Sequence, residues 1–195
     1  MAEENILKNY ATYKGGLDRL FGKEVADNII EALGGEERVT YASYLNTAET
    51  GAAYAGSFIK NVIKLVNLAN KINEQFPEEI RADKTSIGKA CMLSQIAKIV
   101  MFEPNDDKYE IEKRGIIYKY VDLKGALRAG ERSTLIASNA GVKFTDVEYE
   151  AMRALDKSVT EDSYLKFYSS VLSVVIRQAS EIINLTNRLT KSNGN

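Results

Sequence analysis

Apolar side chains recur every three to four positions along much of this chain, which is the spacing of one face of an α-helix. The pattern runs through residues 17–33 up to the pair Gly34 and Gly35, and through residues 56–76 up to Pro77. Because glycines and prolines commonly follow helix ends, both segments are predicted to be helices that stop at these residues.

The same periodicity predicts further helices downstream. Thr145 and Glu148 form a capping box, which typically opens a helix. The last segment carries its apolar residues on one broad stripe, which is typical of a central helix rather than a surface helix. The predicted segments are residues 85–101 (beginning at Thr85 or Ser86), 131–141, 145–155 and 163–189.

The helical pattern is interrupted between residues 105 and 127. This segment begins with the turn-forming triplet Asn-Asp-Asp, and residues 116–121 are rich in β-branched and aromatic side chains, so a short hairpin or an irregular loop is predicted. The glycine pair at 15–16 is interpreted as a helix end. The sequence therefore predicts an all-α fold with one insertion near 105–127, in one domain spanning 1–195 with a frayed tail at 191–195.

The composition is that of a folded globular protein. Of the 195 residues, 45% are hydrophobic and 27% are charged, far from the signature of disorder. Lys98 and Arg177 interrupt the two most apolar segments, so no membrane span is expected, and the start of the chain resembles neither a signal peptide nor an anchor. The 26 basic and 27 acidic residues leave a net charge of −1, which argues against nucleic acid as a main partner.

The chain contains no histidine, and this restricts its chemistry. Ser-His-Asp and Cys-His nucleophile systems and histidine-ligated metal sites are excluded, which leaves carboxylate, lysine or tyrosine chemistry. The single cysteine, Cys91, lies in an apolar run and is interpreted as a buried thiol.

Motifs for common ligands are missing. The sequence has neither a P-loop nor a glycine-rich dinucleotide fingerprint. Asn105, Asp106 and Asp107 lack the spacing of a calcium loop and are interpreted as a solvated turn. No cofactor and no metal are expected.

Several short segments occur in the order seen in the HD-domain metal-dependent phosphohydrolases, particularly the small phage and prophage type. The resemblance covers about residues 39–189. It is carried by residues 44–50, 92–99, 104–106, 113–115, 118–120, 130–133, 141–145 and 148–153. The resemblance implies an HD-domain-like helical bundle over 39–190, preceded by a helical extension over 1–38.

The resemblance also implies that the metal ligands of this family have been replaced. The positions aligned with ligands hold no imidazole and no carboxylate, so metal-activated water is not expected and the chain resembles an inactive relative, not an enzyme. These positions are Lys60, Ser94, Gln95, Leu155 and Ser180.

Positive side chains are expected to replace the charge of the metal. In one alternative, Lys60 and Arg177 pair with Glu131 or Asp156 in a closed ionic plug, which the cost of unpaired buried charge favours. In a second, Lys60 and Arg177 join Lys98 and Arg153 in an open site for a small anion or nucleotide. In a third, the pocket has collapsed and the long side chains reach solvent.

Three functions follow as hypotheses. The leading one is a non-enzymatic, phage-encoded protein with a structural or protein-interaction role, acting in the bacterial cytoplasm or the virion, as a homo-oligomer or with a protein partner. Its contact surface is expected near Tyr10 and Tyr13 or near Ile29 and Ile30. The others are a sensor or sponge that binds nucleotide without hydrolysis, and a hydrolase that uses Glu131, Asp156 and a carboxylate-held metal.

Overall fold

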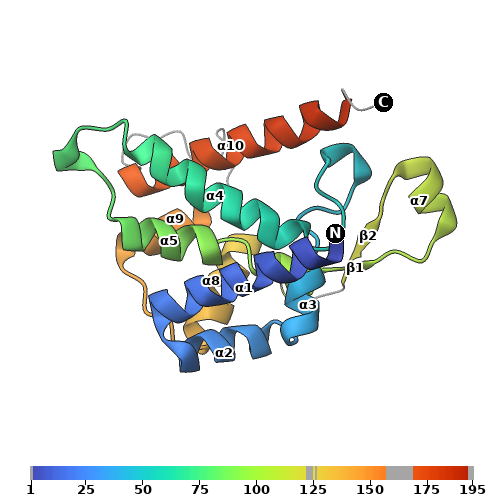
Figure 1. Ribbon diagram of the computed structural model, residues 1–195, viewed down its shortest axis with the longest axis horizontal. Helices are drawn as coiled ribbons and strands as arrows, with labels where there is room; N and C mark the ends of the chain where they lie inside the picture. The colour runs from blue at the N-terminus through green and yellow to red at the C-terminus, as the bar shows by residue number, and fades with distance from the viewer. Residues whose placement is uncertain (1, 122–124, 126, 157–168, 193–195) are drawn as a thin grey trace.

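The computed structural model describes residues 2–121, 125, 127–156 and 169–192, and these form an all-α fold with one small antiparallel sheet (Figure 1). This confirms the predicted fold class. The elements are α1 (Ala2–Phe21), α2 (Lys23–Ala32), α3 (Glu36–Tyr41), the 3-10 turn η1 (Ala48–Thr50), α4 (Ser57–Asn73), the 3-10 turn η2 (Glu78–Ile80), α5 (Lys84–Leu93), α6 (Ala97–Met101), β1 (Phe102–Pro104), α7 (Lys108–Arg114), β2 (Tyr118–Tyr120), α8 (Ala129–Asn139), α9 (Asp146–Arg153) and α10 (Val171–Ser192).

The first helix corrects one prediction, because α1 continues through Gly15 and Gly16 instead of ending there. Gly16 faces α5, where a Cβ atom would lie only 2.8 Å from Cε of Met92. One turn earlier, the Tyr13 hydroxyl donates to the carbonyl oxygen of Met92 at 3.1 Å. The glycine therefore permits close packing of two helices rather than ending one.

The expected contact surface is also wrong. Tyr10, Tyr13, Ile29 and Ile30 are all buried. They belong to the main hydrophobic cluster, because α1 and α2 pack against each other and turn these side chains inward. The same packing makes the first two helices part of the core.

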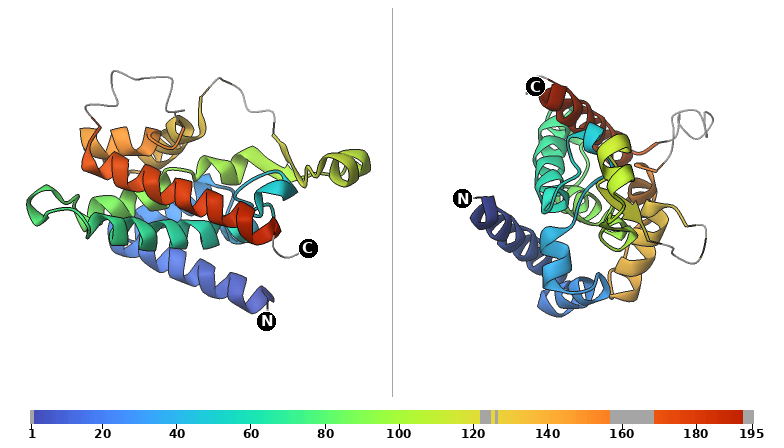
Figure 2. Two further views of the ribbon diagram at one scale, coloured as in Figure 1. Left: turned by 90° about the horizontal axis from the view of Figure 1, so that it is seen from above. Right: turned by 90° about the vertical axis from the view of Figure 1, so that its right-hand side faces the viewer.

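Helix α4 connects the two parts of the hydrophobic core. It packs against α1, α5 and α10, and the perpendicular views show α1 and α10 on different sides of it (Figure 2). Its buried residues divide between two clusters: Phe58 and Val62 belong to the cluster shared with α1 to α3, and Leu65 and Ala69 to the cluster shared with α5, α9 and α10. Burial of these apolar faces is the main driving force for the fold.

The last helix begins at Val171 in the described part of the chain, whereas residues 163–168 of its predicted range lie outside that part. Its other end runs to Ser192, and residues 193–195 of the predicted frayed tail lie outside the described residues.

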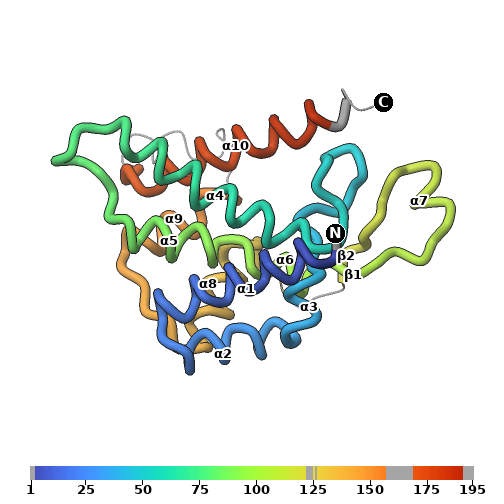
Figure 3. Tube along the Cα trace, in the orientation of Figure 1, coloured from blue at the N-terminus to red at the C-terminus, as the bar shows by residue number. Residues whose placement is uncertain are grey.

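Residues 102–120 form a hairpin that overlaps the predicted insertion, and a hairpin was one of its two predicted alternatives. Strands β1 and β2 pair antiparallel with Phe102 opposite Tyr120, and α7, which the sequence pattern did not predict, connects them and projects at one end of the molecule (Figure 3). Asp107 caps α7 by accepting hydrogen bonds from the Tyr109 and Glu110 amides at 2.9 and 3.2 Å. The Asn-Asp-Asp turn is therefore built into this helix cap.

Among the described residues, none of the helices combines the length and the apolar character needed to cross a bilayer.

Candidate functional site

Part of the expected site lies around a break between α5 and α6, namely Ser94, Gln95, Lys98 and Asp156. At residues 94–96 the backbone tightens to 3-10-type hydrogen bonds, such as Lys98 N–H to the Gln95 carbonyl at 3.0 Å. The Ala97 amide, at the first residue of α6, donates to Oγ of Ser133 on α8 at 2.9 Å. A side chain from another helix thus satisfies a donor at the start of α6, and the break brings Ser94, Gln95 and Lys98 into the interior.

Lys98 supplies a mostly buried positive charge at this break. Its Nζ lies 4.1 Å from the centroid of the Tyr44 ring, a distance typical of a cation–π contact. Burial lowers the pKa of Lys98 to about 8, and the nearby charge of Asp156 opposes this shift. The ammonium is therefore only partly compensated by its surroundings.

Asp156 lies just beyond the end of α9, within hydrogen-bonding distance of Gln95. Its Oδ2 accepts a hydrogen bond from the Gly130 amide at the start of α8, and its Oδ1 accepts one from Nε2 of Gln95 at 3.5 Å. Burial raises the pKa of Asp156, while these hydrogen bonds and the charge of Lys98 oppose the rise. Both carboxylate oxygens are thus engaged by the protein itself.

Tyr44 connects the cluster to α10. Burial raises the pKa of its hydroxyl, and a polar interaction with Ser180 of α10 partly offsets the effect. We call Tyr44, Gln95, Lys98 and Asp156 the Lys98 cluster. Ser94, next to it in the chain, is fully buried, and its Oγ has no hydrogen-bond partner among the described residues.

Lys60 lies outside the Lys98 cluster, which corrects its expected place in an ionic plug. It is exposed on α4, with Nζ 5.6 Å from the Tyr54 ring, because α4 turns its neighbours Ile59 and Asn61 toward the core. Lys98 supplies the buried positive charge instead.

The other expected residues are placed as follows. Glu131 pairs with Arg153, with Nη2 and Oε1 3.3 Å apart, and not with Lys60 or Arg177. Arg177 is half-buried on α10, and it forms no ion pair with any residue that the structure describes. Leu155 packs against the second hydrophobic cluster as an ordinary apolar side chain.

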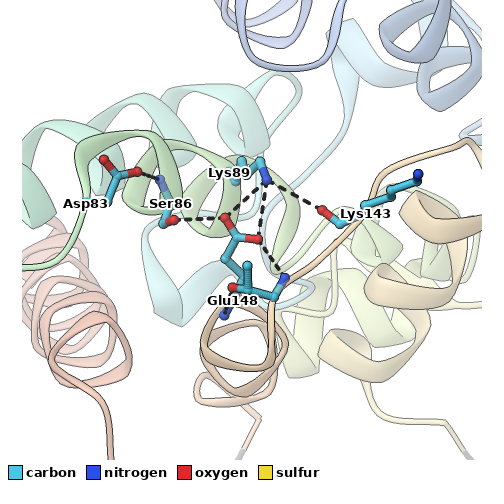
Figure 4. Close-up of polar contacts among 6 residues, drawn as sticks. Asp83, Ser86, Lys89, Lys143 and Glu148 are labelled. Carbon is cyan, nitrogen blue, oxygen red and sulfur yellow. Dashed lines mark hydrogen bonds and ion pairs between the residues drawn. The ribbon is translucent and has the colours of Figure 1, made fainter.

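A second polar cluster, not predicted from the sequence, joins α5 to α9 (Figure 4). Glu148 is only 2% exposed; it accepts a hydrogen bond from Oγ of Ser86 at 2.8 Å and pairs with Nζ of Lys89 at 3.2 Å. Glu148 also accepts a hydrogen bond from the Thr145 amide at 2.9 Å, which completes the predicted capping box. Burial raises the pKa of Glu148, but these contacts outweigh burial and hold the pKa below its ordinary value.

The capping-box spacing predicts the role of Glu148 at the start of α9, but it does not predict the partners of Glu148 on α5. Within the described ranges, no three carboxylate or thiol side chains are grouped so that they could hold a metal ion.

Comparison with known proteins adds no identification: no family model, curated protein or solved structure matches this chain.

Proposed function

We propose that this protein is a non-catalytic relative of the HD-domain phosphohydrolases that works by binding another protein. In this proposal, the Lys98 cluster occupies the place of the family's metal site. The sequence resemblance makes a phage assembly component, or a binder of a viral or host protein, the expected setting.

The observation that carries the proposal is the mostly buried ammonium of Lys98, which lies against the Tyr44 ring and near enough to Asp156 for their charges to interact. An ammonium held at this place repels a divalent cation. Asp156 is the carboxylate nearest to it in the cluster, and its two oxygens already accept hydrogen bonds from Gly130 and Gln95. Hydrolysis by the family chemistry needs a cation that activates water, and this arrangement opposes its binding.

The geometry gives less support to the alternative, an anion or nucleotide site. The Tyr44 ring lies against the ammonium of Lys98, and Arg153 is already paired with Glu131. Lys60, the other cation expected in such a site, is exposed on α4. An anion site would need these side chains to converge on one open space.

The test combines metal analysis with activity and binding assays. The purified protein is incubated with Mn²⁺, Fe²⁺, Co²⁺ or Zn²⁺, desalted and analysed for metal, and phosphate release is measured with nucleoside mono- and triphosphates. We expect no stoichiometric metal and no release. Retained metal, or release that is lost in Asp156→Asn but kept in the surface control Lys60→Met, would overturn the proposal.

The same samples test the anion alternative. Calorimetric titration with inorganic phosphate and with a nucleoside triphosphate is expected to show no binding. Binding that is weakened roughly tenfold by Lys98→Met and unchanged by Lys60→Met would favour the anion site over a closed cluster.

A further inference from the structure

The face formed by α4 and α10 combines an apolar pocket with uncompensated positive charge. The two helices lie side by side in opposite directions (Figures 1 and 2). They are joined in the interior by the side chains of Asn187 and Asn61, whose Nδ2 and Oδ1 atoms are 2.8 Å apart. This buried amide pair fixes the register of the two helices.

A pocket of about 280 Å³ lies along the junction of these helices. Leu68 of α4 and Ile182 and Ile183 of α10 give it an apolar lining, and no acidic side chain lines it. Beside it, Ile182 and Leu185 of α10 are 47% and 49% exposed, one helical turn apart. Apolar area therefore continues from the pocket onto the outer face of α10.

Lysines border this apolar area on α4. Lys64 and Lys71 line the pocket, and Lys60 lies one turn before Lys64. The row extends over about 16 Å of helix. All three are exposed, and within the described ranges none has an ion-pair partner. Burial and the charge of Lys60 both lower the pKa of Lys64, as expected where positive charge is not balanced.

We propose that this surface, the α4–α10 face (Lys60, Lys64, Leu68, Lys71, Ile182 and Leu185), binds an acidic amphipathic helix of a partner protein. The apolar side of that helix packs on Leu68, Ile182 and Leu185, and its carboxylates pair with the lysines. On one face of a helix, side chains recur at intervals of three to four and seven residues. The lysines of α4 have the same intervals, so carboxylates on one face of the partner helix can reach them. The inference rests on the proposed function, since it names the surface through which the protein binds its partner.

Charge and shape distinguish this partner from two other occupants. A second copy in a two-fold dimer would place this face against the same face of its partner, so two lysine-bearing surfaces would meet. A lipid surface needs its apolar anchors at a convex crest, whereas Leu68 and Ile183 line a pocket between two helices. An acidic helix satisfies both the charge and the shape.

The probe is a fluorescein-labelled helical peptide of about 20 residues, with leucines along one face and glutamates flanking them. Its matched control has lysines in place of the glutamates. Fluorescence anisotropy is measured with the wild-type protein, with the charge reversal Lys64→Glu/Lys71→Glu, and with Ile182→Ser/Leu185→Ser. The control variants lie on α1 and α2: Lys8→Glu/Lys23→Glu for the charge reversal, and Leu7→Ser for the apolar substitutions. Circular dichroism verifies that every variant is folded.

We expect the acidic peptide to bind in the micromolar range and to bind at least about tenfold more weakly to both α4–α10 variants, with no change in the controls. The lysine peptide is expected to bind only the charge-reversed protein. Equal binding of both peptides, or no effect of the α4–α10 substitutions, would overturn the inference.

Two further results would replace the proposed occupant. A dimer seen by sedimentation without peptide, and lost in Ile182→Ser/Leu185→Ser, would identify a second copy. Binding to anionic phosphatidylglycerol vesicles but not to the acidic peptide would identify a lipid surface. The metal and hydrolysis assays of the wild-type protein are independent of all these variants, so failure of the α4–α10 inference and failure of the non-catalytic function are distinguishable.

Discussion

Nζ of Lys98 lies 4.1 Å from the centroid of the Tyr44 ring, although the two residues come from different segments of the chain. The ring faces an ammonium that is mostly removed from water, and this ammonium interacts with the charge of Asp156, which is itself partly desolvated. Retaining a charge in such an environment lowers stability unless its partners compensate for the lost hydration. This relationship leads to the first two predictions.

Lys98→Met is expected to raise the free energy of unfolding at pH 7. Methionine keeps most of the length of the side chain and removes the buried charge. The fall in the pKa of Lys98 from 10.5 to about 8 means that keeping its charge in the folded protein costs about 3 kcal/mol. The variant removes this cost but also loses the contact with Tyr44, which cancels a part of the gain. We therefore expect a gain of about 1–3 kcal/mol in denaturant unfolding.

The gain from Lys98→Met depends on pH. Because the pKa of Lys98 is lower in the folded state, the unfolded chain binds more protons above about pH 8, and the wild-type protein becomes more stable as pH rises. Between pH 8 and 9 the advantage of the variant should shrink by about 1 kcal/mol. Above this window the raised pKa values of Cys91 and Tyr13 act in the opposite direction. The prediction would be contradicted if Lys98→Met were less stable than the wild-type protein at pH 7 and if the difference in their free energies of unfolding did not change with pH.

Tyr44→Leu is expected to destabilise the protein by about 2–4 kcal/mol, because it removes a buried ring that also packs near Phe58, with centroids 6.3 Å apart. Tyr44→Phe keeps the ring and should cost under about 1 kcal/mol. In a Lys98→Met background the cost of Tyr44→Leu should fall by about 1 kcal/mol, the size of a cation–π contact. A double-mutant cycle that gives no coupling would show that the ring does not stabilise the ammonium.

Glu148→Gln is expected to cost about 2–3 kcal/mol, because it leaves Lys89 without its ion-pair partner in a mostly buried position. The exposed control Glu112→Gln should stay within about 0.5 kcal/mol of wild type. Since the pKa of Glu148 is held below its ordinary value, its contribution is present above about pH 4.5 and is lost as pH falls through the folded-state pKa. Urea unfolding from pH 7 to pH 3 measures this, and a difference that persists at pH 3 would argue against the carboxylate as its cause.

Gly130→Ala is expected to lower the free energy of unfolding, and Gly15→Ala is expected to raise it. At Gly130 an added Cβ would collide with the Met152 carbonyl and the Asp156 carboxylate, so we expect a loss of about 2–4 kcal/mol. At Gly15, inside α1, nothing lies within 4 Å of an added Cβ, and alanine should stabilise the helix by about 0.5–1 kcal/mol. Thermal unfolding of both variants provides the comparison, and a loss of stability in Gly15→Ala would contradict the continuous helix.

The candidate site shows how far residue patterns reach. The interruption of the most apolar segment by Lys98 was visible, as was the capping box at Glu148. Which lysine is buried was not visible, because Lys60 and Lys98 both follow apolar residues on predicted helices. At the break between α5 and α6, Oγ of Ser133 accepts a hydrogen bond from the Ala97 amide, and Ser133 comes from a distant part of the chain.

The sequence by itself determined the helical class, the interruption of the helical pattern near 105–127, and the capped start of α9, because periodicity, turn residues and caps act through neighbours in the chain. Only the tertiary structure decided that α1 passes through Gly15 and Gly16, that Lys98 and Asp156 share one interior site, and that Ile29 and Ile30 are covered. These features depend on which helices pack together. Helix packing is set by complementary shape and by removal of apolar area from water over long sequence separations, which no local pattern encodes.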